Sequence, residues 1–149
     1  MHKEKAMNLF SEGYNCSQAV FMSFCDELGI EKDTAAKLAS SFGGGMGRMR
    51  EVCGAVSGMI MAAGMLYGYS NPNDREAKTE HYARVQKLAE SFKAENGSII
   101  CRELLGLERG ENSGSEPTER TAEFYKKRPC RELVGAAAQI LEDYMKTAL

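Results

Sequence analysis

Apolar residues recur every three to four positions along most of the chain, which is the spacing of one face of an α-helix. No segment alternates apolar and polar residues as a half-buried strand would. The pattern therefore predicts an all-α fold, a compact helical bundle of about five to seven helices. The expected helices cover, in chain order, residues 2–11, residues 15–29 between Asn15 and Gly29, a short stretch capped by Asp33, residues 52–67, a long stretch from Asn73 or Asp74 to Asn96, a short stretch capped by Ser98, and residues 129–146.

The chain has 149 residues, a length typical of one domain that buries roughly two-thirds of its unfolded surface without disulfide bridges. We therefore expect residues 1–149 to form a single all-helical domain. The stretch from Gly106 to Thr118 is polar, contains glycine and serine, and is interrupted by Pro117. This composition predicts a loop between the last two helices.

Charge and hydropathy indicate where such a domain works. Nineteen basic and 21 acidic side chains give a net charge of -2, which provides no attraction to nucleic acid or to an anionic membrane. The most apolar stretch, from Val52 to Tyr69, contains four glycines and suits a buried helix better than a membrane span. The first residues lack the apolar core of an export signal. We expect a cytoplasmic protein that binds neither nucleic acid nor membrane.

Five cysteines stand in the chain, and four of them, Cys16, Cys53, Cys101 and Cys130, come directly before or at the start of an expected helix. The free N–H groups and the positive dipole end of a helix N-terminus stabilise a thiolate. We therefore expect lowered pKa values at these four thiols. Cys25 lies in the middle of the helix expected over residues 15–29, where core packing is the simpler interpretation.

The segment around Cys53 is the densest chemical signal. Gly54 and Gly58 follow the cysteine at one and five positions, so a partner sulfur, a cofactor or a neighbouring helix could approach closely. Arg48 and Arg50 precede it and would add positive charge that favours a Cys53 thiolate.

The residues on either side of this segment favour structural roles. The glycine run Gly43–Gly47 lacks the lysine and the preceding strand of a nucleotide-binding loop, so it predicts a turn with positive φ values and tight packing. Core filling is the expected role of Met46, Met49, Met59, Met61 and Met65. His81 has no second histidine nearby and is not expected to bind a metal.

The order of the cysteines, with the hexapeptide Cys53-Gly-Ala-Val-Ser-Gly58 at the second position, resembles the redox-active family named for its signature, C_GCAxxG_C_C. The resemblance runs from Gly13-Tyr-Asn-Cys16 through the glycine run to Cys130. It implies Cys16, Cys53, Cys101 and Cys130 as the working residues, whereas Cys25 matches no position of the signature. The resemblance implies no settled substrate.

Three functions are consistent with these residues. In the first, the four cysteines carry out thiol/disulfide exchange or electron transfer, with Cys53 as the attacking thiolate, in a protein that would be a thiol-dependent oxidoreductase if it is an enzyme. In the second, Cys16, Cys53, Cys101 and Cys130 bind zinc or an iron–sulfur cluster. In the third, the cysteines are small buried residues of a non-catalytic helical interaction module.

These functions differ in cofactors and partners. The first needs no cofactor and takes a redox partner protein or a small thiol, whereas the second needs zinc or an iron–sulfur cluster. Four cysteines allow three complete disulfide pairings, and the sequence does not choose among them. The glycine- and methionine-rich helix could also pack against a second copy, which leaves a homodimer open.

Overall fold

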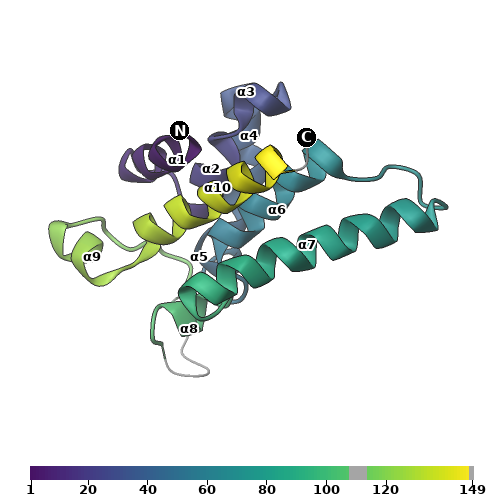
Figure 1. Cartoon of the computed structure of the whole chain (residues 1–149). Coiled ribbons are helices and arrows are strands. Elements are labelled where there is room, and N and C mark those ends of the chain that lie inside the picture. Colours follow the sequence, from purple (N-terminus) through teal and green to yellow (C-terminus); the bar gives the residue numbers. More distant parts are fainter. Residues whose placement is uncertain (108–113, 148–149) are drawn as a thin grey trace.

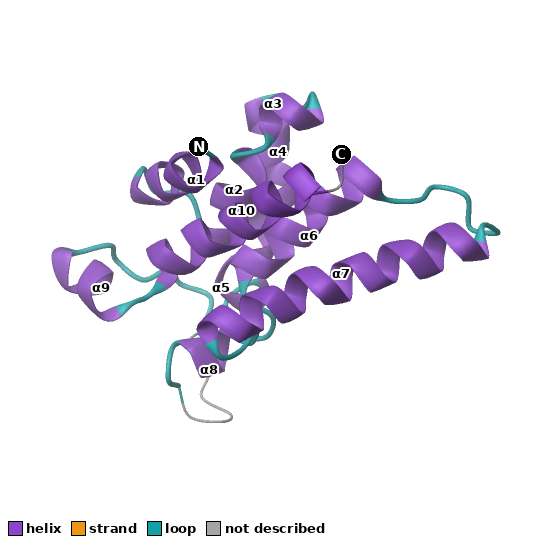
Figure 2. Ribbon diagram, viewed as in Figure 1, coloured by secondary structure: helices purple, strands orange, loops and turns teal. Residues whose placement is uncertain are grey.

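The computed structural model describes residues 1–107 and 114–147, and its elements are all helical (Figure 1). They are, in chain order, α1 (His2–Ser11), α2 (Cys16–Met22), α3 (Cys25–Leu28), α4 (Lys32–Ala39), the 3-10 turn η1 (Ser40–Phe42), α5 (Gly43–Met46), α6 (Gly54–Tyr67), α7 (Arg75–Asn96), α8 (Cys101–Leu104), α9 (Ala122–Lys127) and α10 (Cys130–Thr147). Within the described ranges six helices have seven or more residues and no strand is present (Figure 2). The expected all-α bundle of about five to seven helices is confirmed.

Helix α6 lies inside the bundle, with α2, α7 and α10 packed against it. Helix α1 packs along α10, and α4 packs against α2. The long helix α7 runs beside α6 and α10, and its N-terminal part extends beyond the rest of the molecule (Figure 1). The largest side chains that are completely buried in this core are Phe21, Phe24, Met59, Leu88, Phe92 and Leu141.

The helix expected over residues 15–29 is two helices. Its ends are as predicted: the Asn15 side chain accepts a hydrogen bond from the Gln18 N–H, and Gly29 ends the second helix at a φ of 67°. Between them the helix breaks at Ser23, whose hydroxyl donates to the Val20 carbonyl over 2.6 Å. Such a bond competes with the backbone hydrogen bonds of a helix. Cys25 therefore begins α3. The prediction that it lies in the middle of a helix is wrong.

Other helix starts differ by a residue or two from the prediction. Asp33 lies in the first turn of α4, whose cap position is Glu31. Ser98 stands two residues before the cap of α8, where its hydroxyl accepts from the Ile100 N–H and donates to Glu103. Asp74 caps α7 as expected by accepting from the Ala77 N–H over 3.0 Å.

The C-terminal part of the chain contains one helix that the sequence pattern did not predict. Helix α9 begins after Thr121, whose hydroxyl accepts from the Phe124 N–H. The described residues of the loop expected from Gly106 to Thr118 lie outside helices, while residues 108–113 are outside the described part of the chain. No helix of the described residues is long and apolar enough to cross a membrane.

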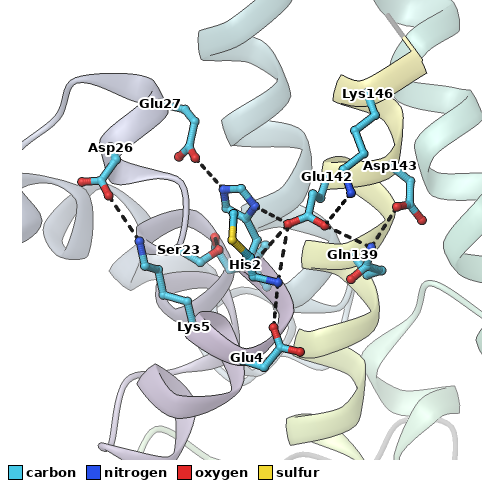
Figure 3. A network of polar contacts seen from close by, with 12 residues as sticks. His2, Glu4, Lys5, Ser23, Asp26, Glu27, Gln139, Glu142, Asp143 and Lys146 are labelled. Carbon is cyan, nitrogen blue, oxygen red and sulfur yellow. Dashed lines mark hydrogen bonds and ion pairs between the residues drawn. The ribbon is translucent and has the colours of Figure 1, made fainter.

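A buried polar cluster fixes α1 against α10 and α3 (Figure 3). The His2 ring nitrogens lie 2.6 Å from a Glu142 oxygen and 2.7 Å from a Glu27 oxygen, and the ring stacks on Phe24. The hydrogen bonds from His2 lower the pKa of Glu142 to about 2. The cluster joins three helices, together with the Lys5–Asp26 ion pair between α1 and α3 and the hydrogen bond from Arg131 of α10 to Ser11 of α1, and it sets the position of α10 on the N-terminal helices.

Candidate functional site

The four cysteines of the signature line one cavity. Cys16, Cys101 and Cys130 are the first residues of α2, α8 and α10, and Cys53 is the N-terminal cap residue of α6, so their predicted placement at helix starts is confirmed. The cavity has a volume of about 290 Å³. Cys25 is not among the described residues that line it and is half-buried elsewhere. All five cysteines are free thiols.

The glycines of the signature let α2 lie directly on α6. A Cβ atom on Gly54 would collide with the Cys16 sulfur and would lie 2.8 Å from the Phe42 carbonyl oxygen. A Cβ atom on Gly58 would lie 2.6 Å from the Ser17 carbonyl oxygen. Both distances are shorter than real Cβ contacts, so the two glycines are needed for this packing. The space expected beside Cys53 is thus filled by a neighbouring helix and its sulfur.

A short antiparallel backbone pairing brings Cys53 and Cys101 together. The Cys53 N–H donates to the Ile99 carbonyl over 2.7 Å, and the Cys101 N–H donates to the Glu51 carbonyl over 2.6 Å. Val52 and Ile100 form an isolated β-bridge between these bonds. In this register Cys53 and Cys101 are diagonal neighbours on the same side of the pairing, a position from which side chains reach each other.

The glycine run before the signature forms the turn that was predicted. Gly44, Gly45 and Gly47 have φ values of 68°, 71° and 56°, in the left-handed region that favours glycine. A Cβ atom on Gly45 would lie only 2.7 Å from the Cys101 Cβ. The Gly44 backbone lowers the pKa of Cys16, although burial raises this pKa by more. The turn therefore lies beside two of the four cysteines.

Two arginines from this turn supply the positive charge that was expected. Arg50 is only 4% exposed, and its Nη1 lies 3.7 Å from the Cys101 sulfur. Arg48 donates to the Gly114 carbonyl and to the Thr118 hydroxyl, and Arg48 and Thr118 both line the cavity. A guanidinium donor at a sulfur stabilises the thiolate over the thiol. The sequence indicated that the two arginines would favour a Cys53 thiolate. In the structure Arg50 lies beside the sulfur of Cys101 instead.

The prediction of lowered thiol pKa values is wrong for three of the four cysteines. Burial raises the pKa of Cys16 and Cys53, and it raises the pKa of Cys130 to about 12. The N–H groups of Ala55 and Val56 at the start of α6 do stabilise a Cys53 thiolate. The loss of water around a buried anion outweighs this stabilisation.

Neighbouring sulfurs add to the effect of burial. The Cys101 sulfur is among the groups that raise the pKa of Cys16, Cys53 and Cys130, and Cys16 acts in the same way on Cys53 and on Cys130. The backbone agrees for Cys53: the Cys16 sulfur lies against the next residue, Gly54, and the backbone pairing brings Cys101 beside Cys53.

The described residues provide no preformed metal site. Within them, no group of three or more histidine, cysteine, aspartate or glutamate side chains is placed to hold a metal ion. His81 is buried, and its Nδ1 lies 2.9 Å from an Arg84 nitrogen. The four cysteines share a cavity without the convergence that four-thiolate coordination requires.

The methionine prediction is only partly right. Met59 is completely buried, whereas Met46, Met49 and Met65 are 40%, 58% and 54% exposed. Core filling is therefore wrong for these three, because they lie in the glycine turn and on the outer face of α6.

Sequence reasoning missed a second group of cavity residues around α9. Arg120 donates to the carbonyl oxygens of Phe10 and Tyr14, and its guanidinium lies 4.1 Å from the centre of the Phe10 ring. The Arg128 guanidinium lies 5.5 Å from the centre of the Phe124 ring. Both arginines line the cavity with the cysteines. The position of Arg128 two residues before Cys130 is the signal that could have identified it.

Comparison with known proteins agrees with the cysteine geometry. The family model described as "Putative redox-active protein (C_GCAxxG_C_C)" matches residues 14–144. A protein of Archaeoglobus fulgidus, described as uncharacterized, is 27% identical over 97% of this chain and 93% of its own length. No solved structure matches the chain. Since the match covers most of the chain and all four cysteines of the cavity, the chain belongs to the C_GCAxxG_C_C family.

Proposed function

We propose that the protein is a thiol redox protein that exchanges disulfides through the four cysteines of the cavity, with Cys101 as the attacking thiolate. The observation that carries this proposal is the Arg50 guanidinium, which lies 3.7 Å from the sulfur of Cys101 in a cavity that Cys16, Cys53 and Cys130 also line. The family description as redox-active supports the same chemistry.

Charge and position both favour Cys101 as the nucleophile. A thiolate and not a thiol attacks a disulfide, and burial raises the pKa of Cys16, Cys53 and Cys130. Cys101 has a cation at its sulfur, is the diagonal neighbour of Cys53 in the backbone pairing, and lines the same cavity as Cys16 and Cys130. The cysteine that resolves its mixed disulfide therefore comes from the same cavity.

The reaction moves two electrons from a protein dithiol to a substrate disulfide. The Cys101 thiolate forms a bond to one substrate sulfur, the substrate S–S bond breaks, and the first substrate thiolate leaves. A second protein cysteine then attacks the Cys101 sulfur of this mixed disulfide, and the second substrate thiolate leaves. A protein disulfide has formed, and the two released thiols carry the proton of the second cysteine and, taken back from solvent, the proton that Cys101 lost when it ionised.

The backbone geometry also favours two of the three complete pairings. Cys53 is the diagonal neighbour of Cys101 in the backbone pairing, and the Cys16 sulfur lies against Gly54, the residue after Cys53. The favoured pairings therefore join Cys53 to Cys16 or to Cys101, and Cys130 to the other.

The test follows the rate at which the reduced protein consumes hydroxyethyl disulfide, a small neutral substrate, by acid quenching and mass spectrometry. Cys101→Ser should lower the rate at least about tenfold, because it removes the sulfur that lies 3.7 Å from the Arg50 guanidinium. Cys25→Ser is the matched control and should react like the parent protein. Circular dichroism establishes that both variants fold. If Cys101→Ser reacts as fast as Cys25→Ser, the proposed role of Cys101 is wrong.

A further inference from the structure

The wall of the cysteine cavity carries a charge opposite to that of the whole molecule. Four arginines line the cavity, Arg48, Arg50, Arg120 and Arg128. Among the described residues that line it there is no aspartate or glutamate, and Glu116 is the carboxylate whose charge acts on Arg48 from beside the lining. The complete chain has a net charge of -2, so the lining differs in sign from the molecule as a whole.

The arginines come from segments far apart in the chain and lie near one another. Burial lowers the pKa of Arg48, and the neighbouring charges of Arg50 and Arg128 lower it further. This effect requires that the three guanidinium groups share one region of space. Binding of an anion is favourable at a site where several positive charges lie close together, because the anion offsets their mutual repulsion.

Arg128 is the arginine best placed to meet a ligand. Its backbone N–H donates to the Phe124 carbonyl, and its guanidinium stacks on the Phe124 ring. Within the described part of the chain this guanidinium donates no hydrogen bond, and its charge favours a Cys130 thiolate. Arg120 uses its guanidinium to hold the carbonyl oxygens of Phe10 and Tyr14, which fixes its charge at the cavity wall. Arginine binds carboxylates through parallel N–H donors, so this wall suits a planar carboxylate.

The remaining lining and the size of the cavity restrict the ligand further. Apolar side chains complete the wall, among them Phe10, Leu104, Phe124 and Leu133. A volume of about 290 Å³ lies at the lower end of the range for ligand sites, which is about 300–1,000 Å³. The ligand is therefore a small molecule with an apolar part and at least one anionic group.

We propose that the substrate of this dithiol site is a small disulfide that carries carboxylate groups, bound by the arginines of the cavity while its sulfurs face Cys101. This inference rests on the proposed function, because it names the substrate class of the same site. The electron balance is unchanged: one substrate S–S bond breaks, one protein S–S bond forms, and the released mercapto acids carry the proton of the second cysteine and one taken back from solvent.

The test compares three disulfides of similar length that differ in charge: dithiodiglycolate, a dianion; hydroxyethyl disulfide, which is neutral; and cystamine, a dication. Each rate with the reduced protein is divided by the rate of the same disulfide with free dithiothreitol, which removes differences between the leaving thiols. The dianion should react at least about tenfold faster than the neutral compound on this scale, and the advantage should shrink at high salt. Cystamine should be the slowest.

Variants and an unreactive ligand separate binding from redox chemistry. Arg128→Gln should lower the dithiodiglycolate rate about tenfold and the hydroxyethyl disulfide rate by a much smaller factor, so that the preference for the dianion is lost. Arg75→Gln, at an exposed position of α7, is the matched control. Adipate replaces the sulfurs of dithiodiglycolate by methylenes, and its binding to the reduced protein is measured by calorimetry, with hexanediol as the neutral counterpart.

Each outcome decides one of the two proposals. Preference for the dianion, loss of that preference in Arg128→Gln and binding of adipate but not of hexanediol support the inference. If the neutral or cationic disulfide reacts as fast as the dianion, the substrate class is wrong while the thiol function stands. If no disulfide reacts but adipate binds and Arg128→Gln abolishes binding, the redox function fails and the anion site stands. Absence of adipate binding overturns the anion site.

Discussion

Replacing Gly58 by alanine tests the close packing that brings α2 and its cysteine onto α6. The new Cβ would lie 2.6 Å from the Ser17 carbonyl oxygen and 3.1 Å from the Val20 Cβ. The first of these atoms belongs to the backbone, so the helices must move apart. Overpacking costs about 1–3 kcal/mol, and a clash with a backbone atom lies in the upper part of this range, at about 2–3 kcal/mol. The better helix propensity of alanine offsets about 1 kcal/mol. We expect a net loss of about 1–2 kcal/mol of unfolding free energy.

Gly64 provides the matched control on the same helix. A Cβ atom at Gly64 would meet nothing within 4 Å, so Gly64→Ala gains helix propensity without a clash. It should stabilise the protein by about 0.5–1 kcal/mol. The assay is urea unfolding followed by circular dichroism, with thermal unfolding as a second measure. At this chain length the midpoint should fall by about 3–6 °C in Gly58→Ala and rise by about 1–3 °C in Gly64→Ala.

Moving α2 away from α6 should also affect the cysteine cavity. Because α2 carries Cys16 into the cavity, Gly58→Ala should slow the formation of protein disulfides that involve Cys16, whereas Gly64→Ala should not. If Gly58→Ala is as stable as Gly64→Ala, the close contact between α2 and α6 does not exist as described. The account of the signature glycines would then be wrong.

Three further results are expected. Arg50→Gln should slow the attack of Cys101 on hydroxyethyl disulfide about tenfold, since it removes the donor 3.7 Å from the sulfur, and an unchanged rate would count against the assigned role. Glu142→Gln should lower the unfolding free energy by about 1.5–3 kcal/mol at neutral pH, relative to Glu95→Gln on the exposed face of α7. Because the folded pKa of Glu142 is depressed to about 2 from 4.5, this difference should persist above pH 4.5 and disappear as the pH falls toward 2, and a constant difference in acid would contradict it. Above pH 9, unfolded Cys130 ionises while folded Cys130, with its pKa of about 12, does not, so stability should fall with rising pH and Cys130→Ser should reduce the slope.

Most of the fold could be predicted from the sequence because helix ends are marked by local chemistry. Asn15 and Asp74 each cap a helix with a side-chain oxygen, and Gly29 and Gly97 each end one in the left-handed conformation. These signals depend only on neighbouring residues. The break at Ser23 was missed because its hydroxyl bond to the backbone leaves no trace in the apolar spacing. Helix α9 was missed because six residues are too few to show a period.

The cysteines of the candidate site could be predicted from the sequence, but the direction of their pKa shifts could not. The positions of the cysteines at helix starts and the small residues after Cys53 were visible in the chain. The direction of the thiol pKa shifts was wrong because burial is a property of the folded molecule, and it outweighs the helix dipole at Cys53. Arg50 could be seen near Cys53 in sequence, but the backbone pairing turns it toward Cys101. Arg120 is held at the cavity by the carbonyl oxygens of Phe10 and Tyr14, which are more than 100 residues away in the chain. The sequence near Arg120 therefore gives no sign of this position.

The most direct test of the account is the order in which the five cysteines of the reduced protein react. Limiting hydroxyethyl disulfide is added, the reaction is quenched with acid at increasing times, and fragmentation mass spectrometry locates each mixed and internal disulfide. The account predicts that Cys101 carries the first mixed disulfide, that internal disulfides to Cys16, Cys53 or Cys130 replace it, and that Cys25 stays free. A first adduct on Cys53 or Cys25, or a lasting adduct on Cys101 without an internal disulfide, would contradict it.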